Sequence, residues 1–155
     1  MSQLIFNVCG SPAPQGSKSA FRNQYTGKIQ QVESSKKVKP WRQDVKQAAI
    51  EARDAAGWQT LTGPVEVHTV FYFRRPNTHY RSGRNAHLLR DAAPAAPANR
   101  ATYDGDKLTR STWDALVQAG VFADDAQIAR WTGEKRWLDI DHPHTGAHIE
   151  VREIQ

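Results

Sequence analysis

One segment organises the rest of the chain: DGDKLTRSTWDALVQAGVFADDAQI, residues 104–128. Apolar and small residues recur in it every three or four positions, which is the period of a helix with one buried face. The spacing predicts a helix over 105–119 that a glycine ends. Lys107, Arg110 and Asp114 share its charged face. Five residues are expected to form the buried stripe: Leu108, Thr112, Ala115, Leu116 and Ala119.

The flanking sequence predicts strands and a second helix. Strands are expected over 4–9, 65–73, 127–138 and 147–154, with 65–73 central. After Pro40, apolar residues and alanines recur at helical spacing as far as Gly57. A hairpin is expected around Thr26 and Gly27. The order β, α, β, α, β, β predicts an α/β (α+β) domain, a mixed β-sheet with two main helices packed on it.

Residues 74–103 interrupt this pattern. The interval carries six arginines, no lysine and one acid, Asp91, and it includes the sequence AAPAAPAN. This composition predicts a long, mobile, Arg-rich insert within a single domain that spans residues 1–155. Two interpretations stay open: a linker between domains, and a loop that orders on a phosphate backbone, with Arg84 among its DNA contacts.

The composition excludes several classes of protein. Hydrophobic residues make up 39% and charged residues 24%, which permits a core and argues against global disorder. No apolar run approaches the ~20 residues of a membrane span, and the N-terminus lacks the pattern of a secretory signal. The single cysteine, Cys9, excludes an intramolecular disulfide and a multi-cysteine zinc site, and we expect it to be buried. Together these features predict a cytoplasmic protein.

Charge is distributed unevenly along the chain. Residues 1–103 hold 15 Lys/Arg and 6 Asp/Glu, a balance of +9, whereas 104–155 hold 6 and 10, a balance of −4. A basic front suggests a surface for a polyanion, and an acidic back suggests a separate carboxylate cluster. Five basic residues of the front are predicted to contact phosphates rather than only solvate a loop: Lys18, Arg22, Lys28, Lys36 and Lys37.

Two pairs of aspartates are the best candidates for chemistry. Each has a structural alternative, because Asp104 before a helix suits an N-cap and Asp124-Asp125 after one suits a polar turn. A helix over 105–119 is ~22 Å long, and six extended steps back from its end cover ~20 Å. A segment that runs straight back along the helix would therefore bring Asp125 within a few ångströms of Asp104 and Asp106.

Three carboxylates so close repel one another, and a divalent cation removes the repulsion. Mg²⁺ prefers oxygen ligands, usually a few carboxylates with waters and substrate phosphate. Such a site lowers the pKa of bound water and stabilises both sides of a phosphoryl displacement. Arg110, one turn into the helix, would place positive charge near the phosphate. Its structural alternative is an i,i+4 pair with Asp114.

The same segment resembles a known family. RusA-type Holliday junction resolvases have the pattern D-x-D-N-x-x-K-x-x-x-D-A-L followed by G-x-x-x-D-D-x-Q, which the chain resembles with DGDKLTRSTWDAL and AGVFADDAQI. The opening GSPAPQGSK, residues 10–18, also resembles that family's start. The resemblance covers most of the chain outside 74–100.

The resemblance implies a Mg²⁺-dependent endonuclease, with Mn²⁺ as the other candidate ion and no organic cofactor. Such enzymes, bacterial or phage-encoded, resolve four-way (Holliday) DNA junctions by paired symmetric nicks in recombination and repair. The resemblance also implies a homodimer, which suits a junction with near-twofold symmetry that takes two cuts. It places the family's essential, metal-binding aspartates on Asp104, Asp106 and Asp125.

The resemblance assigns roles to basic residues as well. The family's catalytic lysine falls on Arg110, a further lysine on Lys135 and the N-terminal basic position on Lys18. Arginine keeps the charge but does not readily release a proton, so an electrostatic role survives the change better than an acid role. Lys107 stands where the family often has asparagine and is a candidate to share the task.

Two other functions fit the same residues. In a non-catalytic DNA-binding protein the aspartates would only cap and pair. A less selective metal nuclease of the restriction type needs an acid-x-Lys element on a strand, and here Glu134 directly precedes Lys135, which is the wrong spacing.

Overall fold

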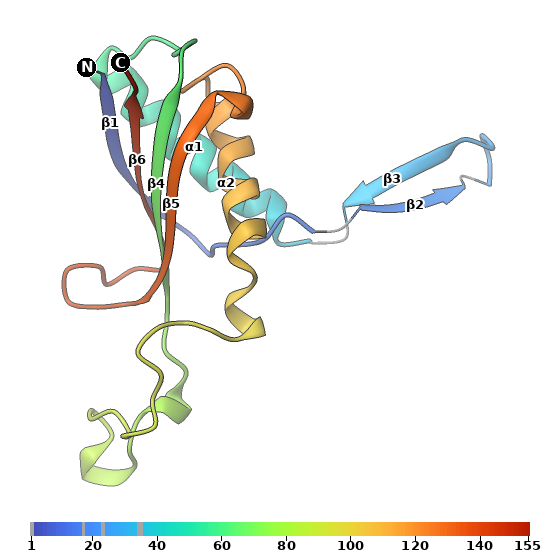
Figure 1. Ribbon diagram of the computed structural model, residues 1–155. Helices are drawn as coiled ribbons and strands as arrows, with labels where there is room; N and C mark the ends of the chain where they lie inside the picture. The colour runs from blue at the N-terminus through green and yellow to red at the C-terminus, as the bar shows by residue number, and fades with distance from the viewer. Residues whose placement is uncertain (1, 17, 23, 34–35) are drawn as a thin grey trace.

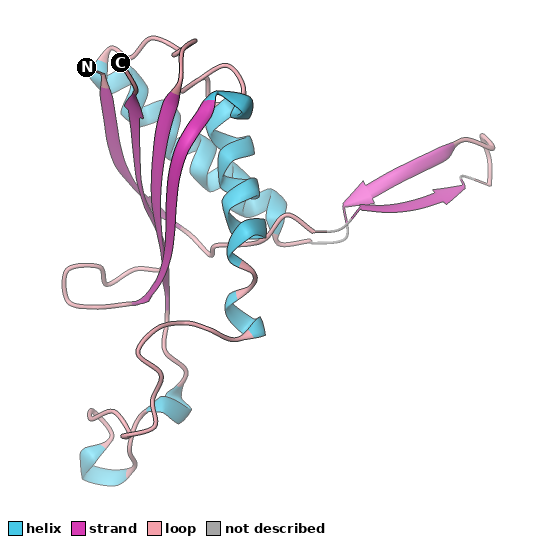
Figure 2. Cartoon of the chain, viewed as in Figure 1, coloured by secondary structure: helices cyan, strands magenta, loops and turns pink. Residues whose placement is uncertain are grey.

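A four-stranded sheet carries both main helices on one face (Figures 1 and 2). The computed structural model describes residues 2–16, 18–22, 24–33 and 36–155. The strands lie in the order β1 (Gln3–Cys9), β6 (Gly146–Glu153), β4 (Val65–Phe73) and β5 (Ile128–Trp137). Strand β6 is antiparallel to β1 and β4, whereas β5 is parallel to β4. The predicted mixed sheet, with 65–73 inside it, is confirmed.

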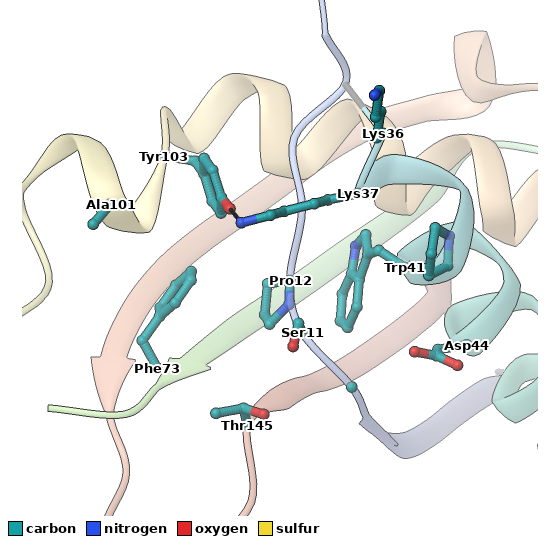
Figure 3. A pocket seen from close by; sticks show the side chains of 12 residues that line it. Ser11, Pro12, Lys36, Lys37, Trp41, Asp44, Phe73, Ala101, Tyr103 and Thr145 are labelled. Carbon is teal, nitrogen blue, oxygen red and sulfur yellow. Dashed lines mark hydrogen bonds between the residues drawn. The ribbon is translucent and has the colours of Figure 1, made fainter. Parts of the chain in front are cut away.

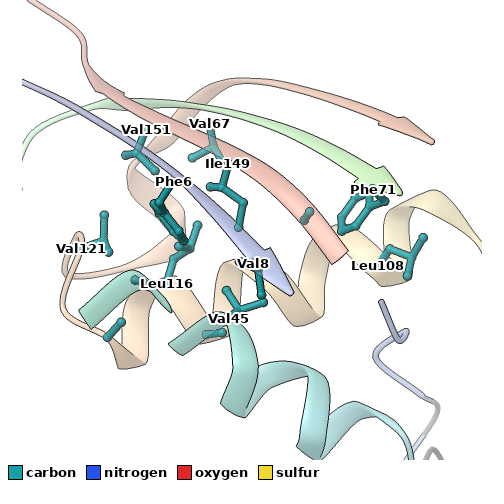
Figure 4. Close-up of a cluster of buried hydrophobic side chains, with 14 of the residues drawn as sticks. Phe6, Val8, Val45, Val67, Phe71, Leu108, Leu116, Val121, Ile149 and Val151 are labelled. Atoms are coloured by element: carbon teal, nitrogen blue, oxygen red, sulfur yellow. The ribbon is translucent and has the colours of Figure 1, made fainter. Parts of the chain in front are cut away.

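The core lies between this sheet and the helices α1 (Val38–Ala56) and α2 (Gly105–Gln118) (Figure 4). The indole Nε1 of Trp41 in α1 donates to Thr112 Oγ1 in α2 at 3.2 Å, inside the core. The predicted stripe of α2 is buried, and Ser111 is buried with it. In β6, Ile149 is fully buried and its neighbours His148 and Glu150 lie on the opposite face, as the alternation predicts.

The element boundaries follow from local chemistry. Helix α1 begins two residues before Pro40, so the proline lies in the first turn, where no backbone N–H is needed. It ends at Gly57, whose φ of 63° is left-handed and suits glycine. One prediction is wrong: Cys9 is exposed, because the alternation of β1 places it on the open face of the sheet.

Strands β2 (Lys18–Arg22) and β3 (Ile29–Glu33) form the predicted hairpin, which projects away from the sheet (Figure 1). Gly27 takes a φ of 68° in the turn between them. Lys28 is exposed in that turn. The side chains of Lys18 and Arg22 lie outside the described part of the structure.

Residues 74–103, called the arm below, leave the end of β4 and return at the start of α2 (Figure 1). The arm contains three short 3-10 helices, η1 (Asn77–His79), η2 (Gly83–Asn85) and η3 (Arg100–Thr102). Its own backbone hydrogen bonds hold it together. Its composition did not reveal this bonding, and the mobility expected from the composition stays a prediction.

The parallel pairing of β4 and β5 determines which ends of the elements meet. Val65 is the register partner of Ile128 at the start of both strands, and Phe71 is the partner of Lys135 near their ends. Helix α2 must run from the ends of these strands back to their starts. Its N-terminus therefore lies near Lys135 and its C-terminus near Ile128. No helix of the described residues is long and apolar enough to cross a membrane.

Candidate active site

Asp104 and Asp106 lie in the first turn of α2, and neither carboxylate is used to build the helix. Asp104 occupies the N-cap position with extended φ and ψ, but its side chain makes no capping hydrogen bond. It pairs with Lys107 at 3.7 Å, and Asp106 pairs with Arg110 at 3.7 Å. Their side chains are 70% and 66% exposed. Capping therefore does not account for Asp104, and both carboxylates are open to a ligand.

Arg110 forms an ion pair back along the helix, with Asp106. Asp114 faces the other helix, where Arg42 of α1 approaches its carboxylate at 3.8 Å. The side chain of Arg110 stays 66% exposed, so its guanidinium lies beside Asp106 with solvent access.

Tyr103, directly before Asp104, has an unusual backbone. Its φ of 68° with ψ of 172° is a conformation that side-chain-bearing residues rarely adopt, and it costs about 1–3 kcal/mol. Among the described non-glycine residues it alone has positive φ. The ammonium of Lys135 donates to the carbonyl oxygen of Tyr103 at 2.9 Å and to Thr102 Oγ1 at 3.1 Å. Lys135 therefore fastens the strained turn from which Asp104 emerges.

Strand alternation explains why Lys135 points inward. Glu134 and Arg136 lie on the open face of β5, where two 2.7 Å hydrogen bonds join them. Arg136 lowers the pKa of Glu134 by these hydrogen bonds. Lys135, between them, points to the helix side and is half-buried. Its predicted role as a DNA contact has less support than a role inside the fold.

A hollow of about 540 Å³ lies between α2 and β5, with Asp106 at one side. Its apolar wall includes Trp113 and Trp131, whose rings meet edge to face at 5.8 Å between centroids. Trp131 is 57% exposed, since β5 is an edge strand and no further strand of the four-stranded sheet covers it. The polar rim of the hollow is formed by Asp106, Arg110, Glu134 and Lys135.

In the second acidic pair, Asp124 and Asp125 have different roles. Asp124 is a true cap: its carboxylate accepts from the Ala126 N–H at 2.8 Å, and Gln127 Oε1 accepts from the Asp124 N–H at 2.7 Å. Gln127 also donates to the carbonyl oxygens of Leu61 and Gly63, at 3.0 and 2.8 Å. Asp125 is exposed and makes no side-chain hydrogen bond or ion pair with the described residues. Only Asp125 is available for chemistry.

Asp125 does not lie beside Asp104 and Asp106 within one chain, so the predicted cluster of three is wrong. Helix α2 has 14 residues, and at ~1.5 Å each its two ends are ~21 Å apart. The path from Ile128 to Lys135 along β5 gives a similar ~23 Å at ~3.3 Å per residue. Asp104 is the N-cap residue of α2, whereas Asp125 begins the short 3-10 helix Asp125–Gln127, which follows the C-terminal end of α2.

The core prevents the straight return. Val121 and Phe122 are fully buried, and the backbone around them pairs with Leu61 through Leu61 N–H to Val121 O at 3.1 Å and Ala123 N–H to Leu61 O at 3.2 Å. Trp58 Nε1 also donates to Val121 O at 3.0 Å. These contacts hold the segment at the C-terminal end of α2, where β5 must begin.

One chain supplies only part of the ligand set of a divalent ion. No group of three or more His, Cys, Asp or Glu residues in the described chain could hold a metal ion. Asp104 and Asp106 supply two exposed carboxylates, and Mg²⁺ in phosphoryl-transfer sites is commonly bound by one or two carboxylates plus substrate phosphate and waters. Asp104 and Asp106 therefore fit a metal ion whose remaining ligands come from elsewhere.

A second hollow, of about 600 Å³, is lined by Tyr103 (Figure 3). Lys36 and Lys37 stand at its rim, and Lys37 Nζ donates to the Tyr103 hydroxyl at 3.4 Å. Phe73 lines it from the end of β4. Two of the predicted phosphate contacts thus lie at the base of the hairpin, next to the residue that precedes Asp104.

Sequence reasoning missed the structural partners of the site. The role of Gln127 was visible as an Asp-x-x-Gln capping box, a pattern that predicts reciprocal hydrogen bonds. The backbone of Tyr103 and the hydrogen bonds that Lys135 makes to Thr102 and Tyr103 had no such signal, because they depend on contacts between residues 32 or more positions apart.

Comparison with known proteins supports the nuclease hypothesis. No curated protein matches the chain. The pattern of the family described as endodeoxyribonuclease RusA matches residues 10–152 of 155, which begins directly after β1 and includes both helices, the arm and both acidic pairs. The chain therefore belongs to the RusA endodeoxyribonuclease family.

Proposed function

We propose that this chain is a metal-dependent endonuclease that resolves four-way DNA junctions by paired symmetric nicks in recombination and repair, and that it acts as a homodimer. The observation that carries the proposal is the state of the acidic residues. In a chain of a nuclease family, Asp104, Asp106 and Asp125 are exposed, and none of them caps a helix.

Asp104 and Asp106 would hold Mg²⁺ or Mn²⁺ at the start of α2. When bound, the ion supplies Lewis-acid activation of water and neutralises charge on the phosphate. The positive end of the helix dipole lies at the same place and favours the scissile phosphate. Arg110 and Lys107 hold the carboxylates in ion pairs without DNA, and their exposed cationic groups attract the phosphate when DNA binds.

Lys135 acts on Asp104 through the backbone. Its two hydrogen bonds keep the Tyr103 peptide in a conformation that the chain would otherwise leave. If the peptide relaxed, the direction in which Asp104 leaves the turn would change. Lys135 is therefore a positioning residue rather than a DNA contact.

A second copy of the chain would complete the site. The exposed Trp131 and the half-buried Trp113 form an apolar surface along α2 and β5, between the end that carries Asp106 and the end that carries Asp125. A twofold axis that passes through this surface perpendicular to α2 makes each end of one chain meet the opposite end of the other. Asp125 of each copy then approaches Asp104 and Asp106 of its partner, which gives two equivalent sites.

The other basic residues that were predicted to contact DNA would bind the duplex branches of the junction. Lys28 at the hairpin turn and Lys36 and Lys37 at its base are exposed. These residues carry no pattern for reading bases, so they would position DNA through its phosphates. Lys18 and Arg22 belong to the same proposal by their place on β2.

Cleavage tests the class of activity. A synthetic four-way junction and a linear duplex of the same sequence are incubated with the protein, with and without Mg²⁺. Symmetric nicks in the junction alone, only with the metal, are expected. Equal cutting of both substrates would favour the less selective nuclease, and binding without any cutting would favour the non-catalytic protein.

Mixing of inactive variants tests the shared site. Asp104→Asn and Asp125→Asn are each expected to be inactive, but a heterodimer of the two keeps one site with all three aspartates. An equal mixture, after exchange of subunits, should regain about a quarter of the wild-type sites, because half of the dimers are mixed. A mixture of Asp104→Asn and Asp106→Asn should regain nothing, which makes it the matched control. No recovery in the first mixture would show that the sites are not shared in this way.

A further inference from the structure

Hydrogen bonds within the arm and at its base hold it together. The Arg90 N–H donates to His79 O at 2.9 Å and the Arg81 N–H to Leu88 O at 2.8 Å, so the chain folds back on itself. At its base, Trp137 Nε1 donates to Pro94 O at 3.0 Å. These bonds give the arm a defined shape, joined to the end of β5.

The structure divides the six arginines of the arm into two groups of three. Arg75 lies 5.1 Å from the Trp137 ring centre and donates to Pro94 O, Arg81 pairs with Asp91 at 3.3 Å, and Arg90 donates to Tyr80 O at 2.8 Å. These bracing arginines support the arm itself. The other three are exposed and make no side-chain contact with the described residues: Arg74, Arg84 and Arg100.

The charge of the protein is concentrated in this arm. Residues 74–103 hold six arginines and one acid, a balance of +5, which equals the formal net charge of the whole chain. The other 15 basic and 15 acidic residues cancel. The arm also lies beyond the N-terminal end of α2, at the end of the molecule that carries Asp104 (Figure 1).

We propose that the arm is a phosphate-binding surface for a duplex arm of the DNA substrate, with Arg74, Arg84 and Arg100 as its contacts. This inference rests on the proposed function and adds a specific interface to it. Because the chain leaves the arm directly into Tyr103 and Asp104, DNA held by the arm leads to the site of cleavage. The three bracing arginines keep the arm in shape without DNA, which lowers the entropic cost of binding.

Salt dependence of binding tests the interface. In the Asp104→Asn background, which prevents cutting, the affinity for a long-armed junction is measured by fluorescence anisotropy over a series of salt concentrations. The triple variant Arg74→Ala/Arg84→Ala/Arg100→Ala should bind at least about tenfold more weakly near physiological salt, with a log–log salt slope smaller by ~0.9 for each lost phosphate contact. On a junction whose arms are shorter than one helical turn, the variant should bind as its parent does.

A matched control removes the same charge from another surface. Arg130, Arg136 and Arg152 lie on the open face of the sheet in ion pairs with glutamates. Their triple alanine variant has the same net charge as the arm variant and should keep the parent's salt slope. Resistance of both variants to limited proteolysis checks that they are folded.

The outcomes separate this inference from the proposed function. Equal weakening by both triple variants, or no weakening by the arm variant, would overturn the arm interface while junction cleavage by the wild-type protein stands. Weakening that persists on the short-armed junction would also overturn it, because the contacts would then lie at the crossover. Failure of the parent to bind any junction would overturn both proposals.

Discussion

The two ends of α2 each carry a pair of acidic residues, and the pairs differ in what they do for the fold. At the C-terminal end, Asp124 closes a capping box and Asp125 is left exposed. At the N-terminal end, Asp104 stands in the cap position without capping, and Asp106 pairs only with an exposed arginine. An acid in a cap position is therefore not always a cap, and its hydrogen bonds distinguish the two roles.

The surroundings of the two ends differ in the same sense. The end near Asp125 is held by buried Val121 and Phe122 and by backbone pairing with Leu61. The end near Asp104 is approached through a strained Tyr103 that Lys135 supports from β5. Strain that a dedicated side chain maintains is characteristic of functional positions. The end near Asp125 thus combines a structural cap with one exposed carboxylate, whereas the end near Asp104 leaves both of its carboxylates exposed.

The largest effect is expected when one carboxylate is removed from the N-terminal end of α2. Asp104→Asn and Asp106→Asn should each lower junction cleavage by about 10³-fold or more, because loss of a metal ligand removes several kcal/mol of charge stabilisation. Single-turnover cleavage with Mg²⁺ measures the effect, and thermal unfolding should shift little. Retained cleavage in both variants would contradict the assignment of the site.

Loss of Lys135 should have the next largest effect. Lys135→Met removes both hydrogen bonds to the turn at Thr102 and Tyr103, so cleavage should fall by about tenfold or more as the turn relaxes, which corresponds to ~1.4 kcal/mol or more. Junction affinity and its salt slope should stay near the wild-type values, since Lys135 is not a phosphate contact.

A rescue distinguishes positioning by Lys135 from a general structural role. Glycine adopts the φ of 68° at position 103 without strain. The double variant Lys135→Met/Tyr103→Gly should therefore cleave faster than Lys135→Met alone. A double variant that is no faster, or a Lys135→Met protein whose salt slope falls, would contradict the positioning role.

Asp124 should respond in the opposite way to Asp104. Asp124→Ala removes the capping hydrogen bond to Ala126 and should cost about 1 kcal/mol of unfolding free energy. Chemical denaturation measures this loss, and cleavage by the folded protein should be nearly unchanged. Asp125→Ala is the control at the next position, with little loss of stability and a large loss of cleavage.

A carboxylate outside both pairs gives the smallest expected effect. The hydrogen bond from His148 lowers the pKa of Glu150 below its ordinary 4.5. A lowered pKa in the folded protein means that the ionised form stabilises the fold above pH 4.5, and that this contribution is lost as pH falls through the folded value. Glu150→Gln should therefore lower the urea midpoint slightly at neutral pH and by less at about pH 3. An equal difference at both pH values would contradict the linkage.

Much of the fold could be predicted because each helix and strand has a pattern in its own stretch of sequence. The stripe of α2, the alternation of β6 and the glycine at the end of α1 each depend on residues close in the chain. The failures have different causes. The exposure of Cys9 follows from the alternation of β1, a local property, whereas the place of Asp125 depends on which elements become neighbours.

The sequence by itself determined that this chain has a mixed sheet with two helices, a basic arm and four candidate aspartates, because periodicity and charge are local properties. The tertiary structure decided which residues Lys135 bonds and that Asp125 lies at the far end of α2. The physical reason is the parallel crossover from β4 to β5. It obliges α2 to span the sheet, and burial of Val121 and Phe122 keeps the following turn at the far end.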